Sequence, residues 1–350
     1  MPTNSARRSV YRGAIIGAGG IARNAHIPAF RQGGGVRERV EIVALVDAAP
    51  DVAPVAGLAA PVLRSPSELE RLGPLDFIDI CTPTASHLDL ALWGLERGYH
   101  VICEKPVAVT RAEADRLAAA ARAAGRVVMP CHQYRFNPAW LKVREWLSDH
   151  RIGRWYLADF TVHRQSADPG SRPGERPWRG TGGASRGGVL LDHGTHLIYQ
   201  LLDVAGEPAG VRAWVARLLH QEYDVEDTAG VLLEYPDRLA TCFMTWASHH
   251  RETRLRFVGE EGRIEWSGGE LLLERHGAGG RTERLDFSRE LDKASYWRWF
   301  ACLFQDFVAA LDGRDASPFL DDVARVAGVL ERAYESARPA AAELPVAAPE

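Results

Sequence analysis

The sequence lacks the features that mark several large classes of protein. Its 350 residues contain 42 basic and 46 acidic side chains, a net charge of −4, without the basic excess of nucleic-acid-binding proteins. No apolar run approaches the roughly 18 residues that a membrane-spanning helix requires. The cysteines number only five and form no C-x-x-C pair. Their wide spacing excludes a disulfide framework or a zinc ribbon and favours reduced thiols.

An export signal and a metal site are also not expected. Arg7-Arg8 resembles the start of a twin-arginine signal, but the apolar segment at 14–16 is too short, and no cleavage pattern follows it. Together with the reduced thiols, this favours a cytoplasmic location. His249 and His250 share no ligand spacing with Cys242, so the sequence predicts no metal centre.

Two different patterns of secondary structure divide the chain, and its length predicts about two domains. Up to residue 130, short β-branched runs alternate with helical segments, which predicts βαβ units and a parallel sheet. Beyond it, most apolar runs are separated by short turns, which predicts a large, mostly antiparallel open sheet. We therefore expect an α/β plus α+β protein. It consists of a Rossmann doubly wound domain in 1–130, a second α+β domain in 131–338 and a flexible tail in 339–350.

The individual elements follow from the same patterns. We expect strands of the first sheet at 10–16, 40–46, 77–81, 100–103 and 127–130. We expect strands of the second sheet at 155–164, 211–219, 228–235, 238–246, 254–258, 263–266, 271–275 and 282–287, and helices at 140–147, 189–204, 296–311 and 320–336. The Gly- and Arg-rich segment 165–187 has no periodicity, and a segment this long is either functional, an exposed insertion or disordered.

A glycine-rich turn follows the first expected strand. Residues 17–22, G-A-G-G-I-A, fit the dinucleotide-binding pattern G-x-G-x-x-(G/A). The tight turn, the close approach of a pyrophosphate and the following helix N-terminus explain the pattern physically. The expected cofactor contacts of this turn are Gly17, Gly19, Gly20 and Ile21. Asp47 ends the second strand, where it can accept hydrogen bonds from the adenosine ribose, and no arginine follows it directly, which favours NAD over NADP.

Five further motifs occur in a characteristic order along almost the whole chain. They are His26 with Pro28, T-P-x-x-x-H at 82–87, E-K-P at 104–106, G-G-x-x-x-D-x-x-x-H at 187–196 and V-E-D-T-A at 225–229. On these motifs the sequence resembles the Gfo/Idh/MocA oxidoreductase family, the group of glucose–fructose oxidoreductase and myo-inositol dehydrogenase. The resemblance implies an NAD(P)-dependent dehydrogenase that acts on CH–OH groups.

Three residues are the expected catalytic set. Lys105 follows a strand of the parallel sheet at the edge where such sheets bind ligands, and the resemblance implies that it holds the reacting hydroxyl. Asp192 and His196 are spaced i and i+4 on an otherwise apolar helix, so we expect them on one face. His196 is the expected general base, because an imidazole pKa of about 6.5 lies near neutral pH. The resemblance implies that Asp192 orients the base or the substrate, while His193 is interpreted as structural.

Further contacts are implied for the cofactor and the substrate. For the nicotinamide half, the resemblance implies Thr82, Pro83, His87, Glu104 and Lys105. For the substrate, it implies Tyr134 and Arg135, while His163 and Trp178 have side chains that suit a sugar or cyclitol ring. It also implies a homodimer or homotetramer formed through the second sheet.

We expect hydride transfer between the nicotinamide and a hydroxyl or ketone carbon of a sugar, amino sugar or cyclitol. One alternative is a glycoside-cleaving enzyme that uses bound NAD for transient oxidation and elimination. Another is a non-catalytic NAD-binding regulator, against which the intact set of Lys105, Asp192 and His196 argues. Neither nucleic acid nor a membrane is an expected partner.

Overall fold

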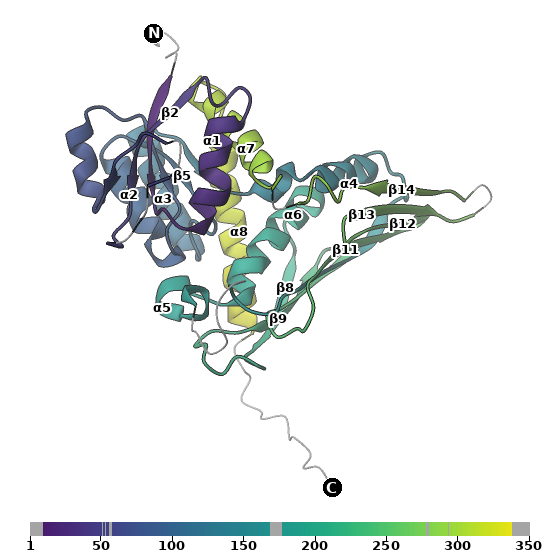
Figure 1. The fold of residues 1–350 in the computed structure, drawn as a ribbon. Helices are drawn as coiled ribbons and strands as arrows, with labels where there is room; N and C mark the ends of the chain where they lie inside the picture. The colour runs from purple at the N-terminus through teal and green to yellow at the C-terminus, as the bar shows by residue number, and fades with distance from the viewer. Residues whose placement is uncertain are drawn as a thin grey trace.

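The computed structural model contains two β-sheets with helices around and between them (Figure 1). It describes residues 10–50, 52, 54, 55, 58–168, 177–277, 280–292 and 294–337. The expected tail at 339–350 and part of the 165–187 segment lie outside the described residues. In the part of the chain that is described, no helix is long and apolar enough to cross a membrane.

The first sheet is parallel throughout, with strand order β3-β2-β1-β4-β5-β6. Its strands are β1 (Tyr11–Ile16), β2 (Val40–Val46), β3 (Val62–Leu63), β4 (Phe77–Ile80), β5 (His100–Cys103) and β6 (Val128–Pro130). This is the strand order of a doubly wound nucleotide-binding sheet, whose switch point lies between β1 and β4. The expected Rossmann fold is confirmed. Only the short β3 is absent from the sequence-based expectation, because two residues cannot show an alternating pattern.

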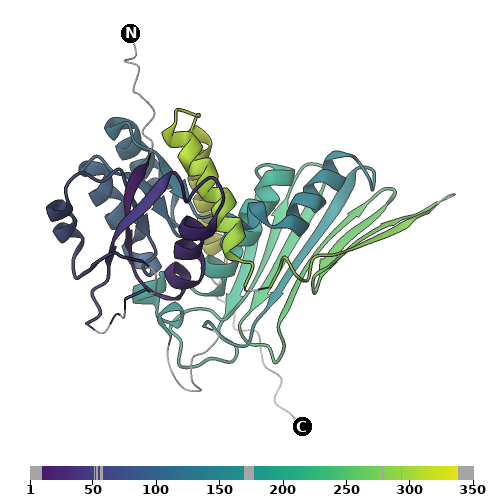
Figure 2. The same ribbon diagram turned by 45° about the horizontal axis from the view of Figure 1, so that its top comes forward.

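Both faces of the first sheet are covered, and the C-terminal end of the chain supplies part of each cover. The helices involved are α1 (Ile27–Gln32), α2 (His87–Glu96), α3 (Arg111–Ala124), α7 (Trp297–Leu311) and α8 (Ser317–Ser336). On one face, Phe304 of α7 stacks on Phe30 of α1 with 4.2 Å between ring centroids. On the other face, Val323 and Ala327 of α8 join the core formed with α2 and α3. The last two helices therefore return to the first sheet (Figure 2).

The second sheet has strand order β14-β13-β12-β11-β7-β10-β9-β8. Every neighbouring pair is antiparallel except β7 with β10, which confirms a mostly antiparallel sheet. Its strands are β7 (Trp155–His163), β8 (Gly210–Ala216), β9 (Thr228–Glu234), β10 (Leu239–Thr245), β11 (Glu252–Gly259), β12 (Gly262–Ser267), β13 (Glu270–Arg275) and β14 (Thr282–Asp286).

One face of the second sheet is covered by helices, whereas no helix among the described residues covers the other. Helices α4 (Pro138–Ser148), α6 (Thr195–Ala205) and α8 cover the inner face, where Trp140 and Trp146 of α4 are fully buried. The opposite face, which we call the outer face, carries Trp214, Leu239 and Phe243, each more than 40% exposed. Since α8 contributes to the cores of both sheets, it joins the two halves of the molecule.

The remaining elements are short turns of helix that connect the strands. They are η1 (Ala22–His26), η2 (Pro66–Leu72), η3 (Thr84–Ser86), η4 (Gln133–Phe136), η5 (Trp178–Gly180), α5 (Gly182–Ser185) and η6 (Leu190–Gly194). Of these, η1 and η6 are π-helical and each leads directly into an α-helix. A division into domains at 130 follows the two sheets and remains our proposal, with α7 and α8 packed against the first sheet although they follow the second in sequence.

The packing of α7 predicts that the first sheet depends on the C-terminal part of the chain. We expect Phe304→Ala to lower the free energy of unfolding by about 3–5 kcal/mol, the usual cost of removing a fully buried phenylalanine. Urea unfolding followed by circular dichroism measures the change. Leu141→Ala on α4, where the side chain is 45% exposed, is the control and should change the free energy by less than about 1 kcal/mol. Equal stability of the two variants would show that α7 does not support the first sheet.

Candidate active site

The glycine turn lies at the switch point of the first sheet. Gly17 has a φ of +97°, and a Cβ added there would lie 2.7 Å from the backbone of Cys81, so only glycine fits. At Gly19 an added Cβ would meet nothing within 4 Å. The backbone there is open to a ligand, as the approach of a pyrophosphate requires. Gly20 and Ile21 follow, and η1 starts directly after Ile21.

Asp47 is held beside this turn at the end of β2. Its carboxylate accepts hydrogen bonds from the backbone N–H groups of Ala18, at 2.8 Å, and Ala49, at 2.9 Å. Each oxygen keeps a lone pair for a further donor such as a ribose hydroxyl. The structure also brings Arg64, which follows β3, to the same loop, where its guanidinium donates to the carbonyls of Ala49 and Pro50. Sequence position alone does not show an arginine near Asp47.

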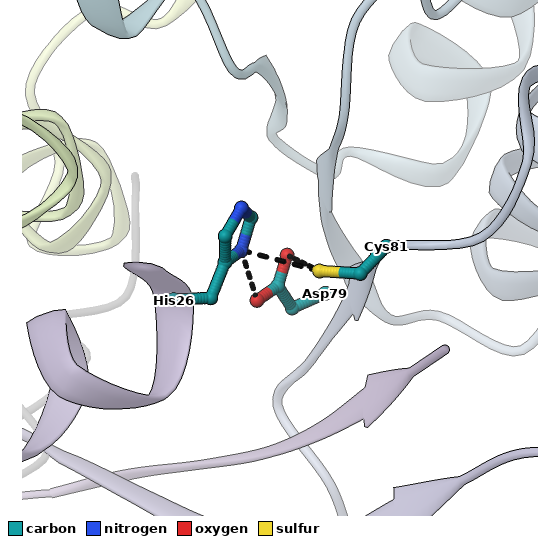
Figure 3. Close-up of side chains that lie close together, drawn as sticks. All are labelled: His26, Asp79 and Cys81. Carbon is teal, nitrogen blue, oxygen red and sulfur yellow. Dashed lines mark hydrogen bonds and ion pairs between the residues drawn. The ribbon is translucent and has the colours of Figure 1, made fainter. Parts of the chain in front are cut away.

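A buried histidine joins the glycine turn to the two strands beside it. The Nδ1 of His26, at the end of η1, lies 2.8 Å from Oδ2 of Asp79 in β4, and its Nε2 lies 3.0 Å from Oε1 of Glu104 after β5. Figure 3 shows the ring facing Asp79 and Cys81. Burial by itself would lower the pKa of His26, but the carboxylate of Asp79 raises it well above the ordinary value. A histidinium therefore donates to two carboxylates at once.

This arrangement sets the position of Lys105. The second oxygen of Glu104 accepts a hydrogen bond from the backbone N–H of Lys105 at 3.1 Å. Glu104 thus faces His26 and the backbone, which makes it a support for the lysine. The Lys105 ammonium donates to the backbone carbonyl of Asp192 at 2.9 Å and to its carboxylate at 2.5 Å. This pair connects the edge of the first sheet to the helix that covers the second.

Asp192 lies in the π-helical turn η6, where the sequence predicts a regular α-helix. A π turn is wider than an α turn, so the i, i+4 argument does not describe the geometry between Asp192 and His196. The carboxylate of Asp192 lies 3.7 Å from the guanidinium of Arg179 and 3.9 Å from the ring of His193. Burial alone would raise the pKa of Asp192, but the charges of Lys105 and Arg179 hold it well below its usual range. The carboxylate therefore stays ionised.

His196 has the opposite electrostatic environment. Its burial and the nearby charge of Lys105 lower the pKa of the imidazole well below the ordinary value. The ring is neutral at neutral pH and can accept a proton. Its Nδ1 lies 2.9 Å from the hydroxyl of Tyr199, and the ring of Tyr134 packs edge-to-face against it at 4.4 Å. Tyr199 is absent from the sequence-based set, although its spacing of three residues from His196 on a helix is a usable signal.

The beginning of the helix that carries Asp192 is held by residues far away in sequence. The carboxylate of Glu226 accepts from the backbone N–H groups of Gly188, at 2.9 Å, and Leu190, at 3.2 Å, and from the hydroxyl of Tyr334 at 2.7 Å. A Cβ on Gly188 would lie 1.9 Å from the carbonyl oxygen of Glu226. This close approach is the physical reason for glycine in the G-G pair.

His87 connects the loops that carry the expected nicotinamide contacts. His87 is buried, with one ring nitrogen 2.8 Å from the carbonyl of Thr82 and the other 2.8 Å from that of Pro106. It therefore joins two loops, and Pro83 directly precedes the short helix η3 between them. Direct contact of Thr82, Pro83 and His87 with a cofactor stays a prediction.

The four expected substrate contacts are divided between three places. Tyr134 lies against His196, and Trp178 shares a cavity with Asp192. The other residues that line this cavity are Thr84, Pro106, Arg179, Ser185, Gly187 and Leu191. Arg135 instead forms ion pairs with Asp203 of α6 and Asp322 of α8, so its guanidinium connects helices.

His163 does not belong to this group of residues. It ends β7, and its ring lines a different cavity together with Phe243 of the outer face. Side chains alternate between the two faces of a strand, and the preceding Val162 belongs to the core under the helices. His163 therefore points to the face opposite α6, which the sequence alone does not reveal.

Two family models match the chain in succession. Residues 11–132 match the model described as "Oxidoreductase family, NAD-binding Rossmann fold". Residues 140–265 match the model described as "GFO/IDH/MocA C-terminal domain". Both halves of the chain thus match the same group of proteins.

Curated relatives show the same similarity. The chain is 28% identical to D-apiose dehydrogenase of Paraburkholderia graminis over 94% of its own length and 88% of that protein. It is 31% identical to D-glucoside 3-dehydrogenase of Escherichia coli over 57% of its length, which spans 56% of that protein. It is 28% identical to the uncharacterized oxidoreductase YdgJ of Escherichia coli over 66% of its length, and it spans 64% of that protein.

Solved structures share the fold. An oxidoreductase from Agrobacterium radiobacter in complex with NAD+, L-tartaric acid and magnesium superposes with a TM-score of 0.80, at 23% identity over 93% of this chain and 96% of that chain. GenD2 from gentamicin A biosynthesis, in complex with NAD, gives a TM-score of 0.77, at 25% identity over 96% of this chain and 97% of that chain.

The ion pairs of Arg135 predict a structural role for this residue. We expect Arg135→Ala to lower the free energy of unfolding by about 3 kcal/mol, because two largely buried carboxylates lose their cation. Arg111→Ala, which removes an exposed pair with Asp115, is the control and should change it by less than about 0.5 kcal/mol. Urea unfolding measures both. A normally stable Arg135→Ala protein with a raised KM would instead support the substrate contact that the sequence predicts.

Proposed function

The chain belongs to the Gfo/Idh/MocA family of oxidoreductases, and on this premise we propose that it is an NAD-dependent dehydrogenase of a sugar, amino sugar or cyclitol. The observation that supports this most strongly is the arrangement at the C-terminal edge of an NAD-binding sheet. There the ammonium of Lys105 contacts an ionised Asp192, close to the neutral imidazole of His196. The similarity to D-apiose dehydrogenase and D-glucoside 3-dehydrogenase supports the substrate class.

The residues of the first sheet fit NAD. The turn at Gly17 and the open space at Gly19 would accommodate the pyrophosphate, and Asp47 would accept from the adenosine ribose. The acidic side chain of Asp47 favours a ribose hydroxyl over a 2′-phosphate, which is why we propose NAD over NADP. NAD, when bound, supplies the hydride acceptor or donor at C4 of its nicotinamide.

The three proposed catalytic residues have different charges and therefore different roles. The Lys105 ammonium binds the reacting oxygen of the substrate and stabilises negative charge that develops on it. His196 accepts the proton of the substrate hydroxyl on Nε2 when Nδ1–H donates to the hydroxyl oxygen of Tyr199. Tyr199 also accepts from the backbone N–H of Tyr134, which fixes its position. Asp192 holds the ammonium of Lys105 in place and keeps its positive charge balanced.

A cytoplasmic location and a homo-oligomer are the remaining parts of the proposal. All five cysteines are free thiols and four are buried, which suits a reducing compartment. The outer face of the second sheet exposes Trp214, Leu239 and Phe243, and an apolar patch of this kind is typical of a protein–protein contact. We propose that two copies of the chain pair through this face, as a homodimer or as half of a homotetramer.

The first test is activity on a panel of sugars, amino sugars and cyclitols with NAD, followed at 340 nm. We expect NADH to form with at least one of them. His196→Ala should lower kcat by about 100- to 10,000-fold, the contribution of a general base, while it retains NADH binding by fluorescence titration. Because the pKa of His196 lies well below its ordinary value, its imidazole stays unprotonated when the pH is lowered through 6.5. We therefore expect kcat/KM to stay constant over that pH range.

The same assay separates the alternatives. Sugar released from a glycoside without net NADH would indicate elimination chemistry, and NAD binding without any turnover would indicate a regulator. His276→Ala, at an exposed position after β13, is the matched control and should retain wild-type turnover. Wild-type turnover by His196→Ala would remove His196 from the catalytic set.

The second test concerns the cofactor. We expect Asp47→Asn to weaken NADH binding by about tenfold, because the charged acceptor for the ribose is lost. The ratio of the NADH affinity to the NADPH affinity should decrease, since the Asp47 carboxylate no longer repels the 2′-phosphate. Fluorescence titration with both cofactors measures the two affinities. Asp89→Asn, at an exposed position of α2, should leave both unchanged. An unaltered preference in Asp47→Asn would show that Arg64 or another group decides it.

A further inference from the structure

A separate group of metal-ligating side chains lies on the outer face of the second sheet. His163 ends β7, Glu252 begins β11, and the two residues pair directly across these neighbouring strands. His250 lies in the turn that leads from β10 into β11. His163 and His250 are 87 positions apart, so spacing within the sequence does not reveal them as a group. The expectation of no metal centre rests on the spacing of His249 and His250 from Cys242 and does not include His163.

The ligand atoms of these three residues form an almost regular triangle. Nδ1 of His163 lies 3.3 Å from Nε2 of His250 and 3.4 Å from Oε2 of Glu252. Nε2 of His250 lies 3.4 Å from the same carboxylate oxygen. Zinc with N and O ligands at about 2.0–2.1 Å in a tetrahedron requires ligand atoms about 3.3–3.4 Å apart. The triangle therefore has the dimensions of one face of a tetrahedral zinc site.

We propose that His163, His250 and Glu252 bind a divalent cation of the zinc type, with a fourth position open to water. Two imidazoles and one carboxylate are a ligand set that zinc takes in proteins. None of these three residues belongs to the proposed dehydrogenase site. The cation site therefore does not rest on the proposed function.

The surroundings of the three side chains support this role. Arg254 approaches the other carboxylate oxygen of Glu252, at 3.9 Å, and leaves Oε2 to the cation. Nδ1 of His250 lies 3.2 Å from the hydroxyl of Ser248, a contact that orients the ring as outer contacts of metal ligands do.

A cation also has a route to the site. His163 and His250 line a cavity of about 380 Å³. The side chain of His250 is 64% exposed. Binding would tie the turn at 246–251 to the end of β7. We therefore expect that occupation of the site raises the thermal stability of the folded chain.

A second histidine cluster shows the contrast. His26 has carboxylate oxygens at 2.8 Å from Nδ1 and 3.0 Å from Nε2, which are hydrogen-bond distances shorter than zinc ligands allow. Its two nitrogens face two different carboxylates, and the ring is fully buried. Figure 3 shows the compact contact with Asp79. Of the clusters found among the described residues, the one on the outer face has the spacing for a cation.

The test is metal binding by the full chain, free of any histidine tag and first treated with a chelator. Isothermal titration with Zn2+ should show one equivalent bound per chain. Co2+ as a spectroscopic probe should give the intense visible absorption of a four-coordinate ion. The melting temperature should rise in excess Zn2+. No binding by the wild-type chain, or Co2+ absorption of a six-coordinate ion, would overturn the proposal.

Variants locate the site. His163→Ala, His250→Ala and Glu252→Gln should each weaken Zn2+ binding by at least about tenfold. His276→Ala, an exposed histidine outside the triangle, should bind as the wild type does. Glu252→Gln keeps the side-chain shape, and its unchanged melting temperature without metal would show that folding is intact. Equal binding by wild type and Glu252→Gln, or weaker binding by His276→Ala alone, would assign the zinc to another place. Binding is measured without NAD or substrate, so these outcomes are independent of dehydrogenase activity.

Discussion

The hydrogen bonds of His26 with Asp79 and Glu104 are the interaction on which the proposed catalytic edge depends. They connect the helical turn after the glycine motif, strand β4 and the loop after β5. The ring of His26 lies in the interior between the carboxylates of Asp79 and Glu104, and its positive charge offsets part of their negative charge. Such a group is costly to disturb, because removal of one member leaves an unpaired charge in the interior. Its direct effect is local, since Glu104 also fixes the backbone of Lys105.

Lys105 in turn contacts a residue of the second half of the molecule. The ammonium contacts both the carbonyl and the carboxylate of Asp192, whose helix is in turn held by Glu226 and Tyr334. Tyr334 belongs to α8, which contributes to the cores of both sheets. Contacts between residues far apart in the sequence thus set the position of the proposed catalytic helix relative to the edge of the first sheet that carries Lys105.

Electrostatics separates the proposed roles of neighbouring groups. The cations around Asp192 keep its carboxylate ionised, while burial keeps His196 neutral. An ionised carboxylate that holds Lys105 and a neutral imidazole that can accept a proton therefore lie on one helix and the turn before it. The proposed cation site lies on the outer face of the second sheet, so the two functions do not share side chains. It lies near the apolar patch through which we propose that copies of the chain pair.

The sequence by itself determined every strand except β3, both sheets and the family. Periodicity and turn residues act locally, and the G-A-G-G-I-A and E-K-P motifs carry their chemistry within a few residues. Only the tertiary structure decided where long side chains point. It turned Arg135 towards Asp203 and Asp322, brought Arg64 to the loop after Asp47, and placed His163 beside His250. It also inserted a π turn at Asp192, which the apolar pattern of the helix does not signal. The reason is that these partners lie between 14 and 187 positions apart in the sequence and meet only when the strands pair and the last helix packs against both sheets.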